Sequence, residues 1–160
     1  MGQMVDQQSV VEWRRKLREA GKRVAFTNGC FDLLHRGHVE YLAEARSLAD
    51  ALVVGVNDDA SVRRLKGPGR PLMPAADRAA ILAALAAVDR VVIFAEDTPA
   101  VLIASLLPDV LAKGGDYKLD EIVGREAVEA AGGKVVRIPF RAGYSTSALI
   151  ARLREEARRS

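Results

Sequence analysis

The sequence TNGCFDLLHRGH, residues 27–38, links a short apolar run at residues 24–27 to an amphipathic stretch at residues 37–48. A buried strand that turns directly into a helix is the repeating unit of α/β folds. The turn lacks both the GxGxxG spacing of dinucleotide-binding loops and the GxxxxGK[ST] spacing of P-loops. It holds instead the two histidines of the chain, His35 and His38, at the start of the predicted helix. We therefore expect this turn to follow a strand of an α/β sheet and to carry polar chemistry.

The alternation of strand and helix continues along the rest of the chain. Apolar runs typical of strands covered on both faces occur at residues 24–27, 51–56, 90–94, 110–113 and 134–138. Amphipathic segments predict helices at residues 10–20, 37–48, 60–65, 75–87, 98–107, 119–131 and 146–158. This order predicts right-handed crossovers and one doubly wound α/β domain, in which helices flank a five-stranded parallel sheet. Ligands of such sheets bind at the carboxyl ends of the strands, where the polar motifs of this chain fall.

The composition excludes several classes of protein. The chain has 160 residues, 49% hydrophobic and 28% charged, as expected for a single globular domain. A net charge of +3 and an aromatic content of 5% argue against a nucleic-acid partner, because little surface can stack on bases. Cys30 is the only cysteine, so no internal disulfide can form, which suits a reducing compartment. Without a signal segment or an apolar run of roughly 20 residues, the chain is expected to be cytoplasmic and not to bind a membrane.

The spacing of His35 and His38 suits phosphate chemistry. At positions i and i+3 of a first helical turn both imidazoles face the same side, and a helix N-terminus favours an anion. Gly37 lets a phosphate approach the backbone, and the imidazoles can stabilise charge on a transferring phosphoryl group. The alternative is that either histidine caps the helix or packs in the core. A zinc site lacks a partner at a matching spacing, and Cys30 is expected to pack rather than react.

Polar residues also follow the second predicted strand. The segment VGVNDDASV at residues 54–62 includes Asn57 and Asp59, and Asp59 is expected to cap the next helix rather than bind a ligand. The basic loop RRLKGPGRP at residues 63–71 offers Lys66 to the phosphates of a triphosphate, and its glycines permit the loop to close.

Three later segments are compatible with the same site. Arg78, near the start of a predicted helix, lies either on a solvated face or in the site. The turn LAKGGDY at residues 111–117 either forms a plain turn or lets its backbone meet a nucleotide. The segment GYSTS at residues 143–147 is expected to cap the last helix and to offer a second anion site.

These motifs together resemble a known enzyme family. TNGCFDLLHRGH is similar to the signature loop of the cytidylyltransferase-like branch of the HIGH nucleotidyltransferase superfamily, which has a Rossmann-like fold. Residues 22–153 resemble the adenylyltransferase of ADP-heptose biosynthesis, whose motifs VNSDASV, RLKGxxRP, VKGGDY and GxST[ST] have counterparts here in the same order. The chain departs at Asp58, where serine is usual. It also carries Phe140 where some cytidylyltransferase relatives have an arginine, with Arg141 one residue later.

The resemblance implies an activity and a set of site residues. The reaction is the transfer of AMP from ATP to D-glycero-β-D-manno-heptose 1-phosphate, by in-line attack on the α-phosphorus. Mg²⁺ would be held largely by the triphosphate, with no metal ligands from the protein. Residues 1–20 form an N-terminal helical extension and residues 21–160 the nucleotidyltransferase domain. The implied catalytic residues are His35, His38 and Lys66. The implied nucleotide contacts are Asn28, Gly29, Cys30, Phe31, Gly37, Arg78, Lys113, Gly114, Asp116, Tyr144, Ser145 and Thr146. The implied contacts to the acceptor substrate are Asp32, Asn57 and Arg70.

Several other functions use the same motifs. A cytidylyltransferase would use CTP and glycerol 3-phosphate, or another small phosphorylated alcohol or sugar. A phosphopantetheine adenylyltransferase usually has proline where this chain has Leu33, and a class I aminoacyl-tRNA synthetase needs more than 160 residues. A non-catalytic nucleotide sensor is the alternative from another class, although the intact histidine pair, Lys66 and Ser145 argue against it. The resemblance further implies a homodimer, and a separate sugar kinase is expected to supply the sugar 1-phosphate.

Overall fold

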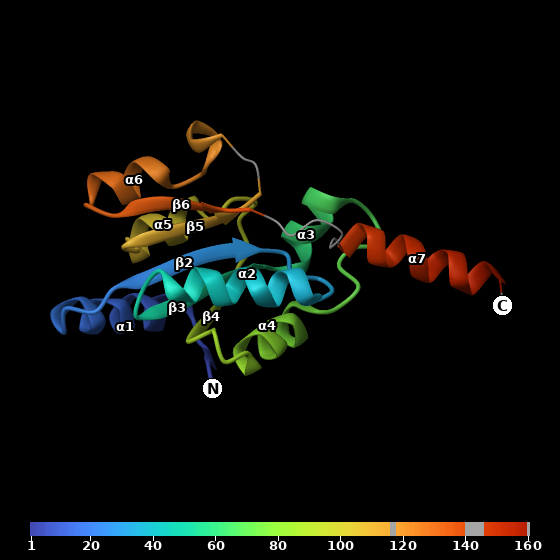
Figure 1. Cartoon of the computed structure of the whole chain (residues 1–160), viewed down its shortest axis with the longest axis horizontal. Coiled ribbons are helices and arrows are strands. Elements are labelled where there is room, and N and C mark those ends of the chain that lie inside the picture. Colours follow the sequence, from blue (N-terminus) through green and yellow to red (C-terminus); the bar gives the residue numbers. More distant parts are fainter. Residues whose placement is uncertain (116–117, 140–145, 160) are drawn as a thin grey trace.

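The sheet at the centre of the fold is parallel throughout. A computed structural model describes residues 1–115, 118–139 and 146–159, and within them six strands lie in the order β1–β4–β3–β2–β5–β6 (Figure 1). The strands are Gln3–Met4 (β1), Val24–Gly29 (β2), Ala51–Asn57 (β3), Arg90–Phe94 (β4), Val110–Gly114 (β5) and Lys134–Ile138 (β6). The predicted α/β class and parallel sheet are therefore confirmed.

Helices cover both faces of this sheet. Successive residues of a strand point to opposite faces, so each inner strand packs against both layers of helices. Val54 packs with α2 and α4 on one face, whereas its neighbour Val53 packs with α1, α5 and α6 on the other. Both valines are fully buried. Figure 1 shows α7 extending away from these layers. The helices are α1 (Gln7–Glu19), α2 (Arg36–Ser47), α3 (Asp59–Lys66), α4 (Ala75–Ala84), α5 (Ala100–Leu106), α6 (Arg125–Ala130) and α7 (Thr146–Arg159).

The edge strand β1 was not predicted, so the expected count of five strands was wrong by one. β1 has only two residues, and Gln3 and Met4 pair with Arg90 and Val91 of β4. So short a strand without an apolar run leaves no periodic signal in the sequence. The segment that follows it joins the same core, because Val10 of α1 is fully buried against the sheet.

The predicted helix at residues 119–131 was also wrong, because the structure divides it. A short 3₁₀ turn at Leu119–Glu121 precedes α6, and Gly124 separates the two with φ at +87°. A β-carbon at Gly124 would lie 2.7 Å from the side chain of Ile103. Glycine is thus required both for the left-handed backbone and for the close approach of α5.

The strand order places the switch point of the sheet between β2 and β5. From β2 the chain crosses to β3 and β4 on one side, and it later returns to β5 and β6 on the other. Helices that run to opposite sides of the sheet at this point leave a crevice outside the carboxyl ends of β2 and β5. Among the described residues, no helix combines the length and the apolar character needed to cross a membrane.

Candidate active site

The two histidines begin α2 directly after the β2 turn. His35 is the N-cap of the helix, and its Nδ1 accepts a hydrogen bond from the backbone N–H of His38 at 3.4 Å. The two rings are stacked, with centroids 3.8 Å apart, on one side of the helix as their spacing predicts. Because Nδ1 of His35 is an acceptor, the neutral ring carries its proton on Nε2. His35 therefore caps the helix through Nδ1, and its other ring nitrogen is a donor.

Burial keeps both imidazoles neutral near pH 7. It lowers the pKa of His38 to about 4, with repulsion from His35 adding to the effect and the Leu33 carbonyl partly opposing it. Burial also lowers the pKa of His35. A neutral imidazole donates one hydrogen bond, and an anion placed beside it favours the protonated form. The pair can thus respond to a phosphate by taking up positive charge.

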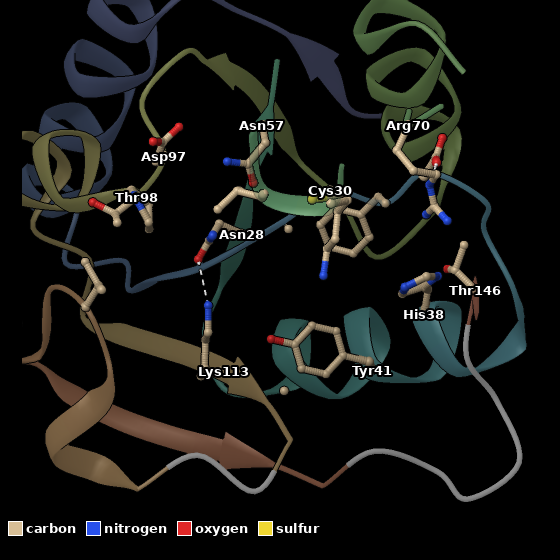
Figure 2. Close-up of a pocket in the computed structure, with 18 of the residues that line it drawn as sticks. Asn28, Cys30, His38, Tyr41, Asn57, Arg70, Asp97, Thr98, Lys113 and Thr146 are labelled. Atoms are coloured by element: carbon tan, nitrogen blue, oxygen red, sulfur yellow. Dashed lines mark hydrogen bonds and ion pairs between the residues drawn. The ribbon is translucent and has the colours of Figure 1, made fainter. Parts of the chain in front are cut away.

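A cavity of about 650 Å³ opens at the carboxyl ends of β2, β3 and β5 (Figure 2). It brings together most of the residues expected from the sequence. Those of the β2 turn and α2 are Asn28, Gly29, Cys30, Phe31, Asp32, His35 and His38. Those from other elements are Asn57, Lys66, Arg70, Lys113, Gly114 and Thr146.

Cations approach this cavity from separate segments. Lys113, in β5, lies with its Nζ 3.4 Å from Oδ1 of Asn28, and burial lowers its pKa. Lys66 comes from the last turn of α3 and Arg70 from the loop that follows it. Several positive side chains around one cavity are suited to an anionic ligand such as a polyphosphate.

Asp32 lines the cavity, but its carboxylate is already engaged by the protein. Its Oδ2 forms an ion pair with Nε of Arg70 at 2.6 Å. Its Oδ1 accepts hydrogen bonds from the backbone N–H groups of Leu72 and Met73, at 2.7 and 3.0 Å. Asp32 thus fixes the loop that carries Arg70, although the sequence suggested only a substrate contact.

Arg78 lies behind the cavity wall rather than in the cavity lining. Its side chain is fully buried and forms an ion pair with Asp59 at 2.7 Å. It also donates to the backbone carbonyl oxygens of Met73 and Cys30. The expected helix cap at Asp59 was wrong, because Asp58 accepts from the N–H of Ser61 and caps α3. Asp59 is used to hold Arg78 instead.

The thiol of Cys30 is not activated. Burial raises its pKa, although Lys66, Arg78 and Arg70 oppose this effect. A thiol with a raised pKa stays protonated at neutral pH, so it is a poor nucleophile. Cys30 contributes shape and backbone to the cavity, which agrees with the packing role expected from the sequence.

Some of the remaining expected residues lie in the described part of the chain and others do not. Gly37, in the first turn of α2, does not line the cavity. Thr146 does, and its Oγ1 donates to the carbonyl oxygen of Leu33 at 3.3 Å. The rest lie outside the described residues, namely Asp116, Arg141, Tyr144 and Ser145.

The cavity also has lining residues that the sequence reasoning missed. Tyr41 follows His38 by three residues on α2, so helical spacing could have identified it. Its hydroxyl bonds to Thr27 and to the carbonyl of Ala112, and burial raises its pKa to about 12. Asp97, Thr98 and Pro99 follow β4, so their position after the end of a strand could have identified them. Leu65 and Val123 also line the cavity and were missed.

The described part of the chain holds no group of three or more His, Cys, Asp or Glu side chains placed to bind a metal ion. A divalent cation in this cavity would need most of its oxygen ligands from a bound substrate, because Asp32 is already paired. The arrangement is therefore suited to positioning anions and stabilising their charge.

Comparison with known proteins identifies the family. The family model described as cytidylyltransferase-like matches residues 26–152. The chain is 55% identical over 151 residues to the bifunctional protein HldE of Mesorhizobium japonicum, a match that covers 94% of this chain and 30% of the relative. It is 57% identical over 151 residues to HldE of Halorhodospira halophila, covering 94% and 32%. The chain thus spans about a third of the length of these curated relatives.

Solved structures agree with this assignment. The lipopolysaccharide core biosynthesis protein of Thermoplasma volcanium superposes with a TM-score of 0.62 at 30% identity, covering 76% of this chain and 98% of that protein. Pantoate-β-alanine ligase of Francisella tularensis gives a TM-score of 0.62 at 14% identity, covering 92% and 69%, which shows a shared fold alone. The sheet order, the histidine pair at the switch point and the family match lead to one conclusion: the chain belongs to the cytidylyltransferase-like family of nucleotidyltransferases.

Proposed function

We propose that the chain transfers AMP from ATP to D-glycero-β-D-manno-heptose 1-phosphate, forming ADP-heptose and pyrophosphate. The observation that carries the proposal is the cavity at the switch point of the sheet, where stacked histidines face cations from three other segments. Two anionic substrates can meet only where positive charge offsets their repulsion. The similarity to HldE proteins and to a lipopolysaccharide core biosynthesis protein supports a sugar phosphate as the acceptor.

In the proposed reaction a phosphate oxygen of the sugar 1-phosphate attacks the α-phosphorus of ATP in line. A new P–O bond forms as the bond from the α-phosphorus to the bridging oxygen breaks, and the electron pair leaves with pyrophosphate. The attacking phosphate is already ionised, so no general base is needed. Catalysis then rests on positioning and charge stabilisation, which His35, His38 and Lys66 are assigned to supply. Mg²⁺ would arrive with the triphosphate and neutralise part of its charge.

A cytidylyltransferase acting on glycerol 3-phosphate, or on another small phosphorylated alcohol or sugar, is the second candidate. The description of the matching family model favours it, and the same cations would serve CTP. A non-catalytic nucleotide sensor is the candidate from another class. Supply of the sugar 1-phosphate by a sugar kinase, a homodimeric assembly and a cytoplasmic location stay predictions.

A direct assay separates these candidates. The protein is incubated with ATP or CTP and with either heptose 1-phosphate or glycerol 3-phosphate, and pyrophosphate release is measured. We expect release with ATP and heptose 1-phosphate. Release with CTP and glycerol 3-phosphate alone would instead support the second candidate, and triphosphate binding without any release would support the sensor.

The role of the cations is tested by Lys66→Met, with Arg63→Met on the same helix as a control. Lys66 lines the cavity, whereas Arg63 is exposed and does not. Loss of one charge that stabilises the transition state should lower kcat about 100-fold or more. Arg63→Met should retain turnover within about twofold. Turnover near the original value in Lys66→Met, or in His35→Ala and His38→Ala, would contradict the assigned roles.

A further inference from the structure

One end of the cavity is lined by polar groups that are not cations. Asn57, the last residue of β3, is 3% exposed and lies in register with Phe94, the last residue of β4. Asp97 and Thr98 follow β4 and line the cavity with Asn57. Figure 2 shows these three residues away from Arg70, His38 and Thr146, toward the opposite end of the pocket. The cavity is therefore chemically asymmetric.

The neighbours of Asn57 determine the orientation of its amide. The backbone carbonyl of Glu96 can only accept, and the hydroxyl of Ser61 donates to it at 3.0 Å. Since its one proton is used there, Ser61 Oγ acts as acceptor toward Asn57, at 2.9 Å. The amide atom that faces Ser61 is therefore the NH₂ group.

A second contact excludes the flipped amide. Nδ2 of Asn57 also lies 3.5 Å from the Glu96 carbonyl oxygen, so a flip would bring two carbonyl oxygens together. The carbonyl Oδ1 of Asn57 is then the atom left for the cavity. Within the described part of the chain, no donor forms a hydrogen bond to it.

We propose that Oδ1 of Asn57 accepts a hydrogen bond from a hydroxyl of the acceptor substrate, and that Ser61 is the positioning residue that presents it. This inference rests on the proposed function and extends it. An oxygen acceptor disfavours a phosphate but suits a hydroxyl donor. The phosphate of the acceptor then lies toward the histidines and Lys66, and the hydroxylated carbons of the sugar lie toward the ends of β3 and β4.

Ser61 can be tested without changing the cavity surface, because its side chain is fully buried. Ser61→Ala removes the acceptor that holds the Asn57 amide. We expect KM for the sugar 1-phosphate to rise about tenfold, which is the loss of one hydrogen bond of about 1.4 kcal/mol. The kcat value and KM for the triphosphate should change less than about twofold. Ser105→Ala is the matched control, because Ser105 is exposed on α5 and bonds only within its own helix.

Methyl phosphate, which carries no alcohol hydroxyl, distinguishes substrate recognition from a general loss of structure. The kcat/KM for methyl phosphate should be the same in Ser61→Ala and the unaltered protein. An equal loss for both acceptors, or a weaker affinity for the triphosphate instead, would overturn the inference.

Failure of the proposed function would be recognised separately. It would appear as no pyrophosphate release from the unaltered protein with any sugar phosphate. Calorimetry would then measure the affinities of the unaltered protein and of Ser61→Ala for the sugar 1-phosphate and for methyl phosphate. Equal sugar phosphate affinity in the unaltered protein and Ser61→Ala would refute the role of Ser61.

Discussion

Burial of His38 should make the stability of the fold depend on pH in a range that one substitution removes. The pKa of His38 is lowered from 6.5 to about 4. Between these values the unfolded chain binds a proton that the folded chain does not. The free energy of unfolding should therefore fall as pH falls from 6.5 toward 4. Above pH 6.5 both states are neutral at this residue, so the full stability is retained.

The size of the effect follows from the shift. A fall in the pKa of His38 from 6.5 to about 4 corresponds to roughly 3–4 kcal/mol as an upper limit. The ring is only partly buried, so water reduces this value to about 1–2 kcal/mol. Urea unfolding of the original protein and of His38→Asn, from pH 7 to pH 4.5, measures it. Carboxylates titrate in both proteins, so the difference between the two curves reports the protonation of His38 together with its coupling to the stacked ring of His35.

The original protein should lose about 1–2 kcal/mol more stability than His38→Asn over this range. Parallel curves for the two proteins would refute the reasoning, because they would show that the folded state does not resist protonation of His38. A larger loss in His38→Asn than in the original protein would have the same consequence.

Two further substitutions test the packing around the site. Asp32→Asn breaks a buried ion pair with Arg70 and should cost about 2–3 kcal/mol in urea unfolding. Asp97→Asn breaks an exposed ion pair with Arg64 and should cost less than about 1 kcal/mol. Equal losses of stability in Asp32→Asn and Asp97→Asn would contradict the structural role of Asp32. Gly124→Ala adds a β-carbon 2.7 Å from Ile103 at φ +87°, and its loss of about 2–4 kcal/mol should lower Tm by roughly 5–15 °C in calorimetry. Gly21→Ala shares the positive φ but has no neighbour within 4 Å, so its Tm should fall by clearly less.

The sequence predicts the central strands and the placement of the motifs because these depend on local patterns. Runs of apolar residues in strands β2 to β6 are long enough to be recognised, and a strand-to-helix turn places His35 and His38 on one face of α2. Parallel pairing then brings motifs far apart in the sequence to one edge of the sheet. Most of the cavity lining could be anticipated in this way.

The errors concern features that local patterns do not determine. β1 is too short to show periodicity, and the break at Gly124 depends on contact with Ile103, which lies 21 positions earlier in the sequence. The partner of Arg78 could not be inferred either, because Asp58 and Asp59 are equally good helix caps by sequence. The position of α4 decides which of the two carboxylates caps α3 and which pairs with Arg78, and that position depends on tertiary contacts.

The Arg78 side chain has a consequence for exchanging parts between relatives. It bonds at once to the turn after β2, to the start of α3 and to the loop that follows Arg70. Asp32 also joins the turn after β2 to this loop, through Arg70 and the backbone N–H of Leu72. A chimaera that imported only residues 63–73 to alter acceptor choice would keep the bonds of Arg78 to Cys30 and Asp59. The imported loop would still have to present the carbonyl of position 73 to Arg78, and two backbone N–H groups and a cation to Asp32. Specificity engineering in this family would therefore have to keep the loop matched to Asp32 and Arg78.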